Sequence, residues 1–92
     1  MPHTNGKVLL QFGATWCGPC KTITPLAEEI ALAEGLTHVK VDIERHPDLA
    51  NSYHIKGVPC FIMLNDGVEL GRSQGSAPNM LRHVVHNCFE GV

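Results

Sequence analysis

The chain has 92 residues, of which 43% are hydrophobic and 17% are charged, and 7 basic against 9 acidic residues give it a net charge of -2. This composition is typical of a globular protein and excludes a low-complexity or disordered chain. Because the sequence holds no Lys/Arg cluster and no apolar run near the ~20 residues of a membrane-spanning helix, we expect neither nucleic acid nor a membrane as its partner. We expect a single domain over residues 1–92 and, because Met1–Gly6 lack the apolar stretch of a signal peptide, a cytoplasmic location.

The first half of the chain predicts a buried strand followed by an amphipathic helix. Val8–Phe12 is a nearly continuous apolar run that ends at Gly13, as expected of a central strand. After Cys17, apolar residues recur at helical spacing from Ile23 to Ala31, and Gly35 predicts the end of that helix.

The second half of the chain predicts two helices and three strands. The Asp66-Gly67 turn indicates a hairpin, because both residues tolerate the positive φ that tight hairpin turns require. The predicted elements are a strand over 37–44, a short helix over 46–53, hairpin strands over 61–64 and 68–70, and a helix over 78–89. The predicted order is therefore β-α-β-α-β-β-α, an α/β fold.

Cysteines stand at positions 17, 20, 60 and 88, and only the first two are close in sequence. A bridge between Cys17 and Cys20 closes a short loop and stabilises the fold by roughly 2 kcal/mol, against about 4 kcal/mol for a loop of some 40 residues. Such a pair therefore indicates redox or metal chemistry rather than a structural staple. No second pair follows at metal-ligand spacing, which favours redox chemistry over a metal site.

The position of the pair predicts a role for each sulfur. Cys17 comes at the start of the predicted helix, where the unpaired N–H groups and the positive end of the helix dipole favour a thiolate. We expect Cys17 to be the nucleophile. Cys20 follows one helical turn later, and we expect it to lie deeper and to act as the resolving thiol.

The motif Trp16-Cys17-Gly18-Pro19-Cys20-Lys21, with Pro25, Lys40 and Gly57-Val58-Pro59, resembles the thioredoxin family. The resemblance extends from about residue 7 to residue 90. It implies a thioredoxin-like fold with a four-stranded mixed sheet and helices on both faces, without the family's usual first strand and helix. It also implies a thiol-disulfide oxidoreductase that reduces protein disulfides, with thioredoxin reductase or a similar electron donor and no cofactor besides the Cys17–Cys20 disulfide.

The resemblance also implies roles for residues around the two sulfurs. Trp16 would shield the site, Pro59 would follow a cis peptide bond and pack beside the sulfurs, and the backbone of Val58 would pair with an extended substrate. The implied binding surface consists of Trp16, Gly18, Pro19, Val58, Pro59, Gly75 and Ser76.

Two positions depart from the family pattern. Gln11 stands where thioredoxins usually carry a buried aspartate that helps to deprotonate the resolving cysteine, opposite the lysine matched here by Lys40. Glutamine cannot take a proton, so either water serves Cys20 or Lys40 alone perturbs it, and we expect slower resolution or a shifted pH optimum. Gly13 stands where an aromatic residue is common, which predicts a more open back of the site.

Other residues receive structural interpretations. Strand alternation predicts a buried, inert thiol at Cys60. The alternative is that Cys60 is a regulatory partner for Cys20. Cys88 is expected to pack in the core.

We expect the edge of strand 37–44 to be bare and protected by its charges. The alternative is that this edge forms a dimer surface, and of the two we expect a monomer. Solvated surface positions are expected for His38, His46, His54, His83 and His86.

Two alternatives to a protein-disulfide reductase stay open at this point. One is a glutaredoxin-like reductase that uses glutathione as its reductant. The other is a protein-binding subunit that uses the surface around the cysteines while redox turnover is incidental.

Overall fold

A four-stranded mixed sheet forms the centre of the protein, whose structure, a computed structural model, describes residues 5–92. The elements are β1 (Lys7–Gly13), α1 (Gly18–Glu34), β2 (Thr37–Asp42), α2 (Pro47–Ser52), β3 (Cys60–Asn65), β4 (Val68–Gln74) and α3 (Pro78–Phe89). The predicted order β-α-β-α-β-β-α is therefore confirmed, and β1 is the first strand of the described residues. The prediction about a signal segment concerns Met1–Thr4 as well and so falls partly outside them.

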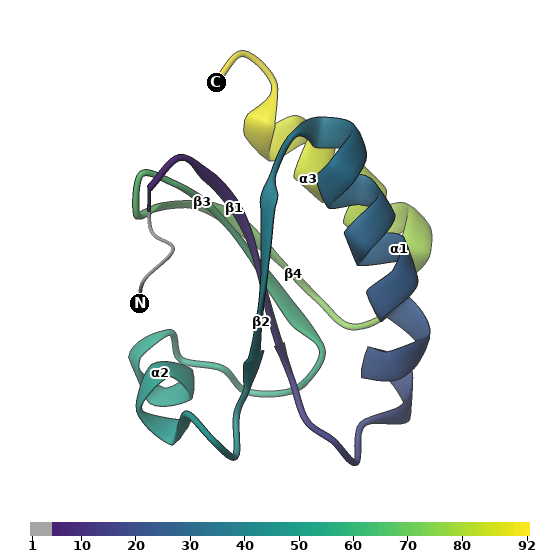
Figure 1. Cartoon of the computed structure of the whole chain (residues 1–92), viewed down its shortest axis with the longest axis vertical. Coiled ribbons are helices and arrows are strands. Elements are labelled where there is room, and N and C mark those ends of the chain that lie inside the picture. The colour runs from purple at the N-terminus through teal and green to yellow at the C-terminus, as the bar shows by residue number, and fades with distance from the viewer. Residues whose placement is uncertain (1–4) are drawn as a thin grey trace.

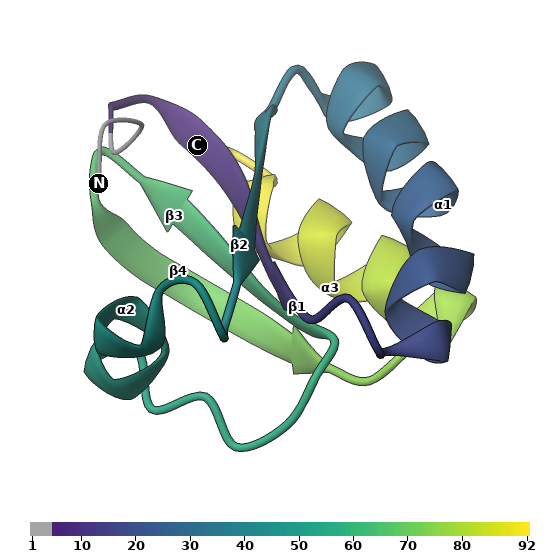
Figure 2. The same cartoon turned by 60° about the horizontal axis from the view of Figure 1, so that its bottom comes forward.

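The strands lie in the order β2-β1-β3-β4, with β1 parallel to β2 and antiparallel to β3, and β3 antiparallel to β4. Helices α1 and α3 cover one face of this sheet and α2 lies on the other side, as Figures 1 and 2 show. This arrangement confirms the predicted mixed sheet with helices on both faces. Among the described residues β2 and β4 are the two edge strands.

Side-chain alternation along the central strands divides the core into two layers. Leu9, Phe61 and Met63 point to the side of α1 and α3, and Leu10 and Ile62 point to the side of α2. β1 and β3 each have a strand on both sides and a packed layer on both faces, which explains their unbroken apolar runs. Gln11 is the exception in β1, because it is a polar residue with only 3% of its surface exposed.

Most predicted boundaries agree with the structure to within one residue, and two differ by more. Helix α3 covers the predicted residues 78–89, and the hairpin turn has positive φ at Asp66 (51°) and Gly67 (83°). Strand β2 ends at Asp42 instead of residue 44, because the Asp42 side chain accepts a hydrogen bond from the Glu44 N–H at 2.9 Å and bends the chain. Strand β4 continues to Gln74 instead of residue 70, because backbone pairing with β3 extends it where polar residues obscure the alternation.

Candidate functional site

Cys17 and Cys20 form a disulfide at the N-terminus of α1. Cys17 is the N-cap residue, and its sulfur accepts a hydrogen bond from the backbone N–H of Cys20 at 3.1 Å. Gly18 and Pro19 occupy the first turn, where a proline loses no hydrogen bond because the N–H it lacks would have no partner in the helix. The helix terminus therefore offers the Cys17 sulfur an N–H donor and the positive end of the helix dipole.

The two cysteines are buried to a similar extent, while their neighbours are exposed. Cys17 is 3% exposed and Cys20 is 5% exposed. The prediction that Cys20 lies deeper is wrong by this measure, because the Cys17 sulfur folds back over the first helical turn to meet Cys20. Trp16 is 66% exposed, and Gly18 and Pro19 are exposed beside it.

The segment before β3 carries a cis peptide bond between Val58 and Pro59, as predicted. The Pro59 carbonyl accepts a hydrogen bond from the backbone N–H of Gly75 at 2.9 Å. In the sheet register, Phe12 pairs with Cys60, and Cys60 pairs with Gln74. The chain segments that carry Cys17, Pro59 and Gly75 thus all adjoin the same end of the sheet (Figure 1).

A polar network lies behind Cys20, where the sequence drew attention to Gln11. The Gln11 side-chain amide donates to Thr24 Oγ1 at 2.9 Å, and that hydroxyl donates to the Cys20 carbonyl at 2.6 Å. Gln11 Oε1 lies 2.8 Å from His38 Nε2. An amide oxygen only accepts hydrogen bonds, so His38 Nε2 is the donor. The network fixes Gln11 between β2 and α1.

His38 is half-buried and bonded to Gln11, so its prediction as a solvated surface residue is wrong. Burial lowers its pKa from the ordinary 6.5, and the nearby positive charge of Lys40 lowers the pKa further. The negative charge of Glu28 acts in the opposite direction. The neutral imidazole is therefore favoured in the folded protein.

The back of the site opens into a cavity of about 340 Å³. A Cβ atom on Gly13 would lie 3.4 Å from Cys20 Sγ, so this glycine lies directly against the Cys20 sulfur. Gln11 and Lys40 are paired across β1 and β2, and both line the cavity. The predicted influence of Gln11 and Lys40 on the reactivity of Cys20 stays a prediction.

The other two cysteines lie apart from this pair. Cys60 is 1% exposed in the core layer on the α2 side, as predicted, and burial raises the pKa of its thiol. Cys88 packs against the other core layer, also as predicted, and burial raises its pKa too. Residues 5–92 contain no cluster of three or more His, Cys, Asp or Glu side chains that could hold a metal ion. None of the helices in that range is long and apolar enough to cross a membrane.

Comparison with known proteins identifies the family. The protein-family model described as Thioredoxin matches residues 2–87. This chain belongs to the thioredoxin family. Its disulfide at the start of α1 is consistent with the Cys-x-x-Cys active site of thioredoxins.

Individual thioredoxins resemble the chain over most of its length. It is 37% identical to "Thioredoxin Y2, chloroplastic" of Arabidopsis thaliana over 98% of this chain and 56% of that protein. It is 47% identical to a thioredoxin of Chlamydia trachomatis over 77% of this chain and 71% of that protein. The structure of reduced Schistosoma mansoni thioredoxin pre-protein superposes with a TM-score of 0.86 at 34% identity, covering 96% of this chain and 84% of the other. The chain thus spans little more than half of the Arabidopsis relative.

Proposed function

We propose that this protein is a thioredoxin-type thiol-disulfide oxidoreductase that reduces disulfide bonds in other proteins. The observation that carries the proposal is the Cys17–Cys20 disulfide, placed at the N-terminus of α1 in a chain of the thioredoxin family. This disulfide closes a loop of only four residues between the N-cap and the first turn of α1, so it can open without unfolding of the sheet. The pair therefore suits a reversible exchange of two electrons.

The reduction proceeds in two exchange steps. In the reduced protein, the Cys17 thiolate attacks one sulfur of the substrate disulfide, forms a mixed disulfide and releases the first substrate thiolate. Cys20 then loses its proton to water, and its thiolate attacks the Cys17 sulfur. The second substrate thiolate leaves, the Cys17–Cys20 disulfide forms, and the substrate has gained two electrons. The Cys17–Cys20 disulfide of the structure corresponds to the oxidised protein that this second step produces.

The surface around the disulfide supplies the contacts with substrate in this proposal. In this proposal the exposed Trp16 offers an apolar ring next to Cys17, and the half-buried Val58 offers backbone groups from the segment before β3. Extended segments bind such backbone groups by strand addition. The proposed surface consists of Trp16, Gly18, Pro19, Val58, Pro59, Gly75 and Ser76.

The proposal extends to the partners and the setting of the protein. A thioredoxin reductase or a similar donor would return two electrons to the Cys17–Cys20 disulfide, and oxidised proteins would receive them. We propose that residues 1–92 act as a single monomeric domain in the cytoplasm.

Turnover by single-cysteine variants tests the proposal. With dithiothreitol as reductant and insulin as the disulfide substrate, Cys17→Ser should lose at least 100-fold in rate, because the attacking thiolate is gone. Cys20→Ser should accumulate a mixed disulfide through Cys17, visible by mass spectrometry, because nothing resolves it. The background should carry Cys60→Ala and Cys88→Ala to remove competing thiols. Equal activity of the wild type and Cys17→Ser would refute the proposal and leave a binding role for the same surface.

The equilibrium potential of the pair separates the two reductase types. Titrated against a thiol-disulfide buffer, a thioredoxin-type pair should lie below the glutathione poise of about -220 to -260 mV. A potential well above that range, together with turnover driven by glutathione, would instead support a glutaredoxin-like reductase.

A further inference from the structure

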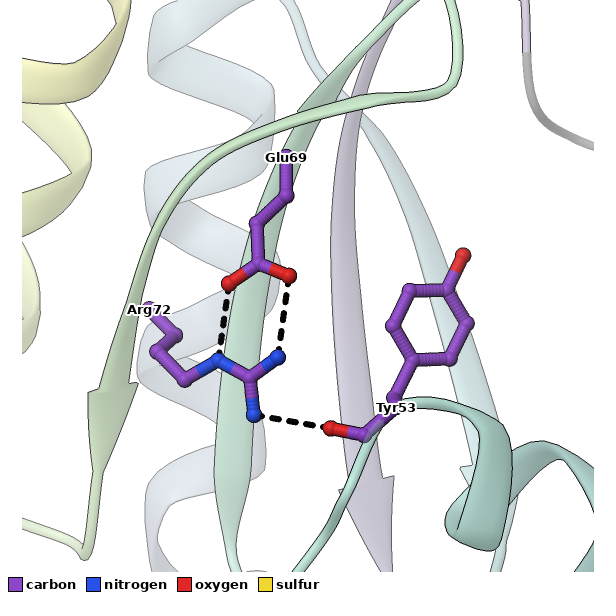
Figure 3. Close-up of polar contacts among 3 residues, drawn as sticks. All are labelled: Tyr53, Glu69 and Arg72. Atoms are coloured by element: carbon purple, nitrogen blue, oxygen red, sulfur yellow. Dashed lines mark hydrogen bonds and ion pairs between the residues drawn. The ribbon is translucent and has the colours of Figure 1, made fainter.

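Arg72 on β4 connects the strand to the end of α2 (Figure 3). Its Nε and Nη2 donate to the two carboxylate oxygens of Glu69 at 2.8 and 2.9 Å, and Nη1 donates to the backbone carbonyl of Tyr53 at 2.9 Å. The bidentate pairing fixes the plane of the guanidinium group. Hydrogen bonding by Arg72 also lowers the pKa of Glu69, so the acceptor stays ionised. The hydrogen bond from Nη1 is thereby directed at the backbone carbonyl of Tyr53, the C-cap residue of α2.

Gln74 contacts the other end of the segment 53–59, which joins α2 to β3. Its side-chain amide donates to the Pro59 carbonyl at 3.4 Å, beside the shorter bond from the Gly75 N–H. A Cβ atom on Gly57 would lie 3.3 Å from the Gln74 amide nitrogen, so the Gln74 side chain lies against the segment 53–59. Arg72 and Gln74 are two residues apart on one strand and therefore face the same side of the sheet. β4 thus contacts the segment 53–59 at both of its ends.

The middle of this segment has no such support. Within residues 5–92, no backbone hydrogen bond of turns or loops involves Lys56, Gly57 or Val58. The segment is otherwise anchored by apolar packing of Ile55 and Val58 against the core. Backbone groups without partners at Val58 are what an extended substrate requires for pairing, and their position depends on how the two ends are held.

We propose that Arg72, oriented by Glu69, and Gln74 are positioning residues that hold the Val58–Pro59 segment where it pairs with extended disulfide substrates. The proposal rests on the proposed function. None of the three side chains takes part in sulfur chemistry. They fix the peptide segment whose backbone binds the substrate chain, and so they bear on substrates that extend beyond the disulfide itself.

Substrates of two sizes test this proposal. Insulin offers chain on both sides of its disulfides, whereas 5,5′-dithiobis(2-nitrobenzoate) offers little beyond the disulfide. For each variant we would measure kcat and KM with both. Arg72→Leu should lower the ratio of kcat/KM for insulin to kcat/KM for the small disulfide about tenfold, mainly through KM, because a charge-assisted hydrogen bond is lost. Arg72→Lys should restore part of the ratio by donating to the Tyr53 carbonyl.

Glu69→Gln and Arg82→Leu complete the experiment. Glu69→Gln keeps Arg72 but loosens its orientation, so the ratio should fall about two- to threefold, and this variant carries the test if Arg72→Leu does not fold. Arg82→Leu removes an exposed arginine on α3 and should keep the wild-type ratio. An unchanged ratio in both Arg72→Leu and Glu69→Gln, or equal losses with both substrates, would overturn the inference. A wild type that reduces neither disulfide would instead refute the proposed function.

Discussion

The two edges of the sheet carry two polar networks of opposite character. Next to β2, the buried Gln11 and the half-buried Thr24 and His38 form a neutral network that ends at the Cys20 carbonyl. Along β4, Glu69 and Arg72 form a charged network with side chains 37% and 35% exposed. Hydrogen bonds join four residues in the first network, including Cys20, and three in the second, including Tyr53. The two networks differ in whether water can replace a lost partner.

That difference predicts unequal contributions to stability. A buried polar group that loses its partner keeps the full penalty of its desolvation, about 1–3 kcal/mol. When an exposed ion pair is broken, water hydrates the group that remains. Such a pair therefore contributes about 0–1 kcal/mol to the free energy of unfolding. The inner network should therefore dominate stability, while the outer one should act mainly on the position of the segment it holds.

Gln11→Leu should give the largest effect, because it breaks the inner network. It leaves the His38 Nε2 donor without its acceptor, and we expect a loss of about 1–3 kcal/mol in the free energy of unfolding, measured with urea. The double variant Gln11→Leu/His38→Leu should lose less than the sum of the two single variants, since the orphaned donor is then gone. Additive losses would argue that the two side chains are not coupled.

Acid should lower the stability of the fold through His38, because the protonated ring is disfavoured by its burial and by the nearby Lys40. The folded pKa of His38 lies below the ordinary 6.5, so the unfolded chain binds more protons between these two values. The contribution of His38 is complete above pH 6.5 and is lost as the pH falls through the lowered pKa. His38→Gln, which can still donate to Gln11, should flatten the decline in stability between pH 7.5 and 5. The exposed His83→Gln serves as the control, and a wild-type slope in His38→Gln would contradict this assignment.

Glu69→Gln should have the smallest effect on stability. Removing the charge should reduce the free energy of unfolding by less than about 1 kcal/mol at low salt. The difference from wild type should shrink as salt is raised to 1 M, because ions screen exposed charges. A loss above 2 kcal/mol that persists in salt would show that this outer network behaves like the buried one.

The sequence predicts much of the site because its chemistry is local. The helix start at Cys17 follows from the pattern of residues, and the cis bond at Pro59 follows from the resemblance. The prediction of a solvated His38 is wrong because the alternation in 37–44 indicates only which side chains share a face of the strand. It does not indicate what packs against that face. The partner of Gln11 depends on the register between β1 and β2, which no local pattern specifies. A glutamine within the apolar run Val8–Phe12 was the available signal, since a buried amide needs partners.

The place of β1 in the sheet has a consequence for synthesis of the chain. Val8 pairs with Thr37 on one side and with Leu64 on the other, so the central strand is made before either neighbour. At about 5–20 residues per second, its apolar run leaves the ribosome several seconds before β3 can cover it. During that interval Val8–Phe12 lacks at least one of its two partner strands, and apolar segments exposed in this way aggregate or bind chaperones. Translation slowed between β1 and β3 should therefore lower the yield of folded protein.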